Sequence, residues 1–149
     1  MRIRDLHPRG AGLAGRAVSA GALFAALLSL MAVENGLEIQ GGLTTGVRMF
    51  TVGEGFALVL VGVLGLLSAV TLFFLRGLAL PAALTGTAAW SAAFGYFARS
   101  HPDRSPLLLL NGRLPRPGLA ALVMVAAFWI CLLSAVLWWR HLARKAGRG

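Results

Sequence analysis

The stretch Phe56–Leu75, with the sequence FALVLVGVLGLLSAVTLFFL, contains no charged residue and no histidine. Roughly 20 helical residues cross the ~30 Å hydrocarbon layer of a membrane, because a helix rises about 1.5 Å per residue. Three other stretches are equally free of charge: Ala17–Val33, Leu78–Ala98 and Leu119–Trp139. Since lipid admits only helices or closed barrels, the sequence predicts an all-α membrane protein in which residues 1–149 form a single four-transmembrane-helix bundle.

Each predicted helix carries small residues at intervals of about four, which places them near one face of the helix. Small residues let transmembrane helices approach closely, and such packing is what holds helices together in lipid. The predicted helix-packing interface comprises Gly21, Ala25 and Ser29 in the first helix, Gly65 and Ala69 in the second, Ala83, Thr87, Ser91 and Gly95 in the third, and Ala127, Cys131 and Ala135 in the fourth. Packing within the bundle is the favoured interpretation, and a dimerisation or partner-docking face is the alternative.

The basic residues are distributed unequally between the two sides of the predicted bundle. Nine lie in the terminal tails and in the turn at Arg76, whereas five lie in the two other loops, Glu34–Gly55 and Arg99–Gly118. The positive-inside rule therefore predicts that both termini are cytoplasmic. The formal net charge of +9 is expected to meet anionic membrane lipids rather than nucleic acid. The residues expected to contact lipid headgroups are Arg140, Arg144, Lys145 and Arg148.

The first external loop carries a strand-like pattern. Leu37–Gln40 alternates apolar and polar residues, Gly41-Gly42 can supply a tight turn, and Val47–Val52 contains β-branched residues. The dipeptide Asn35-Gly36 indicates that the first helix ends before this pattern begins. The sequence therefore predicts a small β-hairpin in the loop between the first two helices.

Side chains suited to catalysis or to cofactor binding are scarce. The histidines His7, His101 and His141 lie outside the predicted spans and on two sides of the membrane, so they cannot meet at one metal ion. Cys131 has no cysteine or histidine neighbour at metal-ligand spacing. The sequence contains no Gly-rich phosphate-binding motif and no charge within the spans that would mark an ion relay. We therefore expect no catalytic, metal or cofactor site and no enzymatic activity.

These patterns favour a small integral membrane protein that acts by helix packing, as an accessory or scaffold subunit of a larger assembly. Its expected partners are membrane lipids and either another membrane protein or further copies of itself. The alternative is a small oligomeric transporter or channel with a neutral pathway lined by the hydroxyl groups of Ser68, Thr71, Thr85, Thr87 and Ser91. Thirteen of the 14 basic residues are arginine, and alanine and glycine are abundant. This composition points to a bacterial genome and hence to the bacterial inner membrane.

Overall fold

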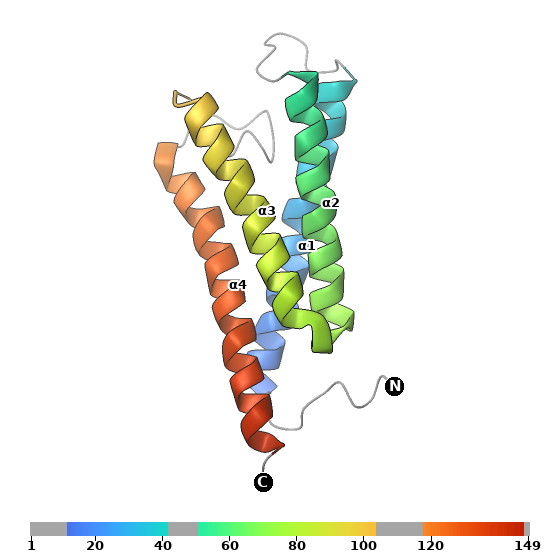
Figure 1. Ribbon diagram of the computed structural model, residues 1–149, viewed down its shortest axis with the longest axis vertical. Coiled ribbons are helices and arrows are strands. Elements are labelled where there is room, and N and C mark those ends of the chain that lie inside the picture. The colour runs from blue at the N-terminus through green and yellow to red at the C-terminus, as the bar shows by residue number, and fades with distance from the viewer. Residues whose placement is uncertain (1–11, 42–50, 104–117, 148–149) are drawn as a thin grey trace.

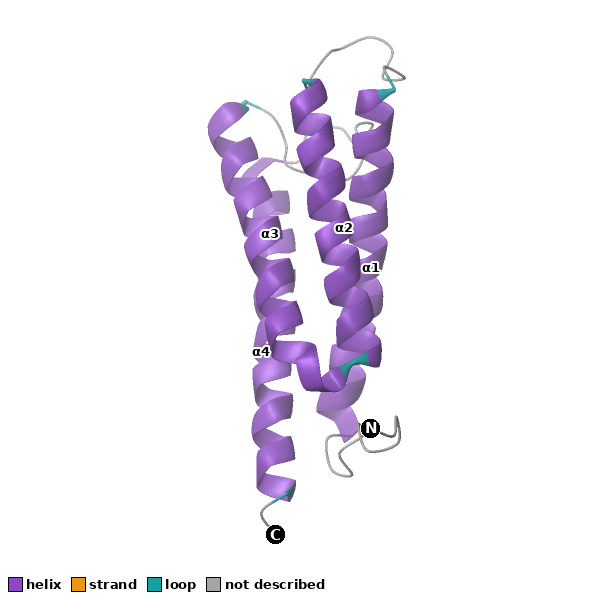
Figure 2. Cartoon of the chain, turned by 45° about the vertical axis from the view of Figure 1, so that its right-hand side comes forward, coloured by secondary structure: helices purple, strands orange, loops and turns teal. Residues whose placement is uncertain are grey.

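The computed structural model describes residues 12–41, 51–103 and 118–147. Nearly all of them belong to four α-helices (Figure 1), which are α1 (Gly12–Gln40), α2 (Val52–Phe74), α3 (Ala79–Ser100) and α4 (Gly118–Ala146), with the 3-10 helix η2 (Arg76–Leu78) between α2 and α3. No strand occurs among the described residues, and Figure 2 accordingly shows purple helices and teal loops but no orange strand. The expectation of an all-helical fold is confirmed.

Three helical segments are long and apolar enough to cross a membrane: α1, α2 and residues Ala126–Ala146 of α4. These lengths and compositions are those of a membrane protein. The helix α3 has 22 residues but does not belong to this group. Its glycine, threonine, serine, tryptophan and tyrosine residues have low hydropathy, which leaves it outside this group. Among the four helices, α3 is therefore the least suited to being surrounded by lipid.

The helices run up and down, each antiparallel to the next in sequence (Figures 1 and 2). The helix α2 packs against α1 and α3, and α4 packs against α3 and α1, so the bundle closes in the order α1, α2, α3, α4. One end of the bundle, here called the η2 end, holds the start of α1, η2 and the end of α4. The opposite end, here called the Glu54 end, holds the end of α1, the start of α2 and the end of α3.

The predicted β-hairpin is not supported. Leu37–Gln40, its expected first strand, forms the last turn of α1, and residues 42–50 lie outside the described part of the chain. Asn35 and Gly36, expected to end the first helix, lie inside it and are buried. The cause is tertiary contact. Gly36 faces α2, where the lack of a side chain permits close packing instead of a turn.

The helices α1 and α2 meet along a line of glycines. A Cβ added at Gly36 would lie 2.8 Å from the carbonyl oxygen of Gly55, and one added at Gly55 would lie 3.2 Å from the carbonyl oxygen of Gly36. A Cβ at Gly62 would lie 2.8 Å from the carbonyl oxygen of Ser29. Backbone atoms cannot rotate away as side chains can, so the two helices touch backbone to backbone. The contacts of Gly36, Gly55, Gly62 and Gly65 with their neighbours are here called the α1–α2 seam.

Two tryptophans fill the space between this seam and the other two helices. Trp90 of α3 and Trp129 of α4 are each 1% exposed, and their rings stack with centroids 6.3 Å apart. A Cβ at Gly65 would lie 2.7 Å from Trp90 Nε1, and a Cβ at Gly86 would collide with the Trp129 ring. The core therefore pairs large indole rings with glycines, which places α3 and α4 at the distance that the rings determine.

Candidate functional site

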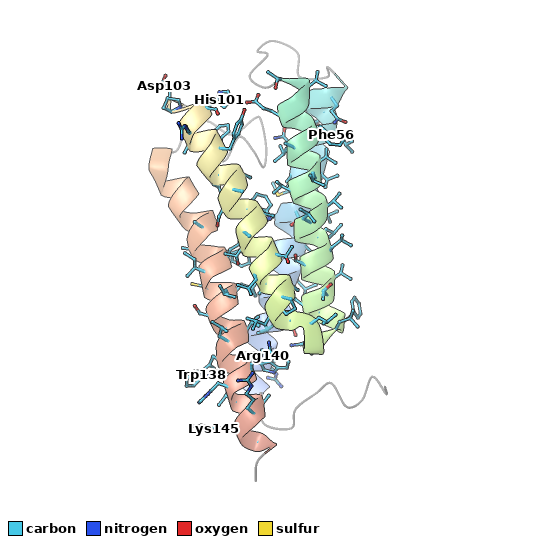
Figure 3. The ribbon with its side chains drawn as sticks, in the orientation of Figure 1. Phe56, His101, Asp103, Trp138, Arg140 and Lys145 are labelled. Atoms are coloured by element: carbon cyan, nitrogen blue, oxygen red, sulfur yellow. The ribbon has the colours of Figure 1, made fainter. Side chains whose placement is uncertain are left out.

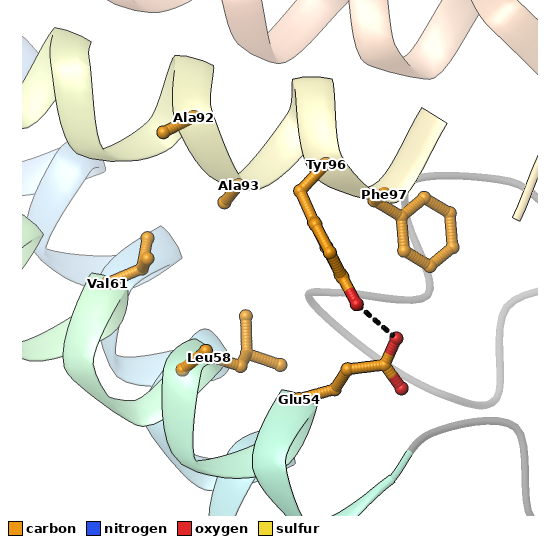
Figure 4. A pocket seen from close by; sticks show the side chains of 8 residues that line it. Glu54, Leu58, Val61, Ala92, Ala93, Tyr96 and Phe97 are labelled. Carbon is orange, nitrogen blue, oxygen red and sulfur yellow. Dashed lines mark hydrogen bonds between the residues drawn. The ribbon is translucent and has the colours of Figure 1, made fainter. Parts of the chain in front are cut away.

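A cavity of about 230 Å³ lies between α2 and α3, in the half of the bundle next to the Glu54 end. It is open on one side and is here called the α2–α3 groove. Figure 4 shows small and apolar side chains on both walls and a carboxylate at one end. The lining residues are Glu54, Ala57, Leu58 and Val61 from α2, and Ala92, Ala93, Tyr96 and Phe97 from α3. The groove therefore fits an apolar occupant far better than a polar one.

A hydrogen-bonded cluster joins α2 to the end of α3 across the groove. Glu54 Oε1 accepts a hydrogen bond from the Tyr96 hydroxyl at 3.2 Å and lies 3.0 Å from His101 Nε2. The other carboxylate oxygen of Glu54 accepts the backbone N–H of Thr51 at 2.7 Å. These four residues, Thr51, Glu54, Tyr96 and His101, are here called the Glu54 clasp. The Tyr96 contact is drawn in Figure 4.

The start of α2 explains why Glu54 occupies this position. Thr51 is the N-cap of α2 and accepts the N–H of Glu54 at 3.2 Å, while Glu54 accepts the N–H of Thr51, which makes a capping box. Sequence reasoning missed this feature, although the spacing of Thr51 and Glu54 is its known signature. The Glu54 partners Tyr96, on α3, and His101, just after α3, lie more than 40 residues away in sequence, and no local pattern identifies them.

The clasp contains a carboxylate next to an imidazole, a pair that can transfer protons in enzymes. In residues 12–41, 51–103 and 118–147, however, no third metal-ligating side chain joins it. Its hydroxyl groups are also engaged, because Thr51 and Tyr96 both contact the Glu54 carboxylate. The arrangement thus links helices and caps α2 rather than presenting a nucleophile to the groove.

A second polar connection lies at the η2 end. Arg76 is 8% exposed; its Nη1 donates to the carbonyl oxygen of Gly15 at 3.3 Å, and its Nη2 donates to the Ser19 hydroxyl. The guanidinium lies 5.8 Å from the ring centroid of Trp139, within cation–π range. Burial lowers the pKa of Arg76, yet an arginine stays protonated at physiological pH. The sequence presented Arg76 only as a charge in a turn; the structure makes it a link between α1, η2 and α4.

Three buried side-chain polar atoms in the bundle core have no hydrogen-bond partner among the described residues. They are Ser29 Oγ, Trp90 Nε1 and Trp129 Nε1. Two of them, from Ser29 and Trp90, both border the point where a Cβ of Gly65 would lie. A buried polar atom without a partner costs free energy, so this junction of α1, α2 and α3 is a local weak point in an otherwise close-packed core.

The residues of the predicted packing interface are divided between the interior and the surface. Ala25, Ser29, Gly65, Ala69 and Ala83 are buried, Gly21, Thr87 and Ala135 are partly buried, and Ser91, Gly95, Ala127 and Cys131 are exposed. In the predicted lipid-contacting tail, Arg140 is partly buried and Arg144 and Lys145 are exposed (Figure 3), while Arg148 lies outside the described residues. None of the five hydroxyl residues proposed for a channel lines the α2–α3 groove.

The exposed surface of α3 differs from that of α1 and α2. Its exposed residues between Leu84 and Tyr96 are small: Thr85, Ala88, Ser91, Ala92 and Gly95. We call these five the α3 face. Nothing lies within 4 Å of a Cβ added at Gly95. The exposed surfaces of α1 and α2 instead present large apolar side chains, among them Leu23, Phe24, Leu27, Leu30, Phe56, Leu60, Leu67 and Phe74.

Comparisons with models of known protein families, with curated proteins and with solved structures gave no match. The function is therefore inferred from the geometry of the bundle itself.

Proposed function

We propose that this chain is a small, non-enzymatic integral membrane protein that serves as an accessory or scaffold subunit. In this proposal the α3 face packs against an apolar transmembrane helix of a partner membrane protein. The exposed small residues of α3, in contrast to the large exposed residues of α1 and α2, are the observation that carries the proposal.

Small residues on a membrane helix favour contact with another helix rather than with lipid. They let two backbones approach, and close packing is the main source of helix association in a bilayer. Ala92 belongs both to the α3 face and to the wall of the α2–α3 groove, so a partner helix lying on the face would also cover the groove. The low hydropathy of α3 has the same implication, because a partner would shield this helix from lipid.

The proposal places both termini and the η2 end on the cytoplasmic side of a bacterial inner membrane, with α3 spanning the membrane beside the other three helices. The basic residues support this orientation. Arg76, Arg140, Arg144 and Lys145 all lie at the η2 end, and cytoplasmic flanks are enriched in such residues.

An oligomeric channel remains the second candidate, because Thr85 and Ser91 are exposed on the same surface of α3. Copies of the chain packed through α3 would bring these hydroxyl groups together. The Thr85 hydroxyl already donates to the carbonyl oxygen of Pro81 at 2.8 Å, and that of Thr87 donates to Ala83 at 2.7 Å. With these donors used inside the helix, the side chains offer a permeating solute only acceptor groups.

Site-specific photo-crosslinking in native membranes tests the proposal. A photoreactive residue at Ser91 should link the chain to a distinct membrane protein, whereas one at Leu67, on the lipid-exposed surface of α2, should react only with lipid. Gly95→Leu should abolish the protein crosslink while leaving the thermal stability of the purified chain unchanged, because the position is open. Val63→Leu on α2 is the matched control and should keep the crosslink.

Three outcomes would count against a partner subunit. Lipid adducts alone at both positions would show that the α3 face is not a docking surface. A crosslinked product of twice the chain mass would favour the oligomeric alternative. Retention of the crosslink in Gly95→Leu would place the contact elsewhere.

A further inference from the structure

The charged residues of the described chain are segregated between the two ends of the bundle. Every described carboxylate lies at the Glu54 end, on Glu34, Glu38, Glu54 and Asp103. Among the described residues, the charged side chains at the η2 end are all basic: Arg16, Arg76, Arg140, Arg144 and Lys145. Figure 3 shows Arg140 and Lys145 beside Trp138 at this end, with His101 and Asp103 at the other.

Arg76 is the member of this basic group that is hardest to explain by solvent exposure. It is 8% exposed, and its two described hydrogen bonds go to uncharged oxygens, of Gly15 and Ser19. A guanidinium has five N–H donors, so part of its hydrogen-bonding capacity is unused by the described residues. A buried charge is costly unless an opposite charge accompanies it. No described carboxylate lies at the η2 end, so none of the described residues supplies a counter-charge to Arg76.

The start of α3 adds a second attraction for an anion at the same place. Its N-cap, Leu78, makes no side-chain capping bond, and the first turn of α3 contains no acidic residue. The Ala79 N–H already donates to the carbonyl oxygen of Arg76, and Pro81 has no N–H, so the start of α3 attracts an anion through the positive end of its helix dipole rather than through a set of free N–H groups. Gly77, the residue between Arg76 and Leu78, is exposed, and nothing lies within 4 Å of a Cβ added there.

The depth of the site in the membrane identifies the anion. Trp138 lies at the η2 end (Figure 3), Trp139 follows it in the sequence, and tryptophans of membrane helices gather at the level of the lipid headgroups. Trp139 also contacts Arg76 directly. At this level the abundant anions are lipid phosphates, and arginine binds phosphate oxygens in a two-pronged geometry that its planar guanidinium matches.

We propose that Arg76 and the start of α3 form a binding site for the phosphate group of an anionic phospholipid, with Arg140 as a flanking cation. The lipid neutralises the buried guanidinium and thereby stabilises the junction of α1, η2 and α4. This inference rests on the membrane location of the chain and not on the partner helix, so it is tested on the purified protein without any partner.

The test is to titrate lipid into the purified chain in neutral detergent and to measure the midpoint of its thermal unfolding at each lipid concentration. Phosphatidylglycerol should raise the midpoint, because a ligand that binds only the folded state stabilises it, whereas phosphatidylcholine should not. Arg140→Gln should weaken the apparent affinity for phosphatidylglycerol about fivefold, which corresponds to the ~1 kcal/mol that one basic residue contributes near an anionic headgroup. Arg99→Gln, at the Glu54 end, is the matched control and should not change the affinity.

Arg76→Lys tests the central residue, since lysine keeps the charge but loses the planar fork. The midpoint increase should then fall to a small fraction of the wild-type value. If Arg76→Lys fails to fold, the comparison of Arg140→Gln with Arg99→Gln decides the question. Equal shifts in all variants, or an equal shift with phosphatidylcholine, would overturn the proposal. A shift produced equally by inorganic phosphate would overturn the assignment to a lipid.

Discussion

The two sides of α2 make very different contacts. Towards α1, its glycines lie against backbone atoms, as at Gly55 and Gly62. Towards α3, the side chains of Ala57, Leu58 and Val61 border an open groove. The same helix thus belongs to a backbone-to-backbone seam on one side and to a loosely filled interface on the other.

The helices α2 and α3 are connected at both ends of their interface. At one end, η2 connects the two helices through a short turn, and at the other the Glu54 clasp bridges them. Between these points Trp90 fills the core next to Gly65, and the groove begins beyond it. The difference shows that α2 meets α1 through close backbone contacts, whereas it meets α3 through side chains, with a polar cluster at the Glu54 end and an open groove beside it.

The largest effect is expected for Gly62→Ala in the α1–α2 seam. The new Cβ would lie 2.8 Å from the carbonyl oxygen of Ser29 and 2.9 Å from the backbone nitrogen of Val33. Forcing the helices apart should lower the free energy of unfolding by about 1–3 kcal/mol, the usual cost of overpacking a filled interface. Thermal and denaturant unfolding in detergent measure the change. Gly95→Ala on the α3 face is the control, and an equal loss in both variants would show that the seam is no tighter than the open surface.

The sequence was sufficient to predict the helical architecture, because each predicted span lacks charged residues over a membrane-crossing length. It did not locate the seam. Gly36 and Gly55 fall in the predicted external loop Glu34–Gly55, because Asn35-Gly36 favours a turn and the charge-free second span begins only at Phe56. Only the neighbouring helix reveals that these glycines serve close contact.

The small-residue column of the third helix shows a second limit of sequence reasoning. Residues spaced by four advance about 40° further around a helix at each step, because one turn takes 3.6 residues. Accordingly Ala83 is buried, Thr87 is partly buried, and Ser91 and Gly95 are exposed. The pattern could predict that small residues cluster on α3, but not that the cluster turns from the bundle to its surface.

The Glu54 clasp is expected to give an intermediate effect in Glu54→Gln. The substitution removes the negative charge that meets His101 and weakens the hydrogen bond from Tyr96. Weakening of this partly exposed contact with His101 and of the helix cap should together cost about 1 kcal/mol.

Hydrogen exchange distinguishes this local effect from a global one. Amides at the end of α3 should exchange faster in Glu54→Gln, while those along the α1–α2 seam should be unaffected. Glu34→Gln, an exposed carboxylate at the same end of the bundle, is the control. Faster exchange along the seam as well would show that the two sides of α2 are not independent.

The smallest effect is expected where the seam meets α3, at Ser29. Its hydroxyl is buried and has no hydrogen-bond partner among the described residues, so Ser29→Ala removes a polar atom for which the described structure provides no hydrogen bond. The free energy of unfolding should stay within about 0.5 kcal/mol of the wild type or rise slightly, because removing an unpaired buried group relieves its desolvation cost.

The matched comparison is Ser19→Ala, the same substitution at the other serine of α1. The Ser19 hydroxyl accepts a hydrogen bond from Arg76 and donates to Gly15 at 3.0 Å, so its loss should cost about 1 kcal/mol. If Ser29→Ala proves the more damaging of the two in thermal unfolding, the hydroxyl of Ser29 has a partner in the membrane, and the junction of α1, α2 and α3 is a polar contact rather than a weak point.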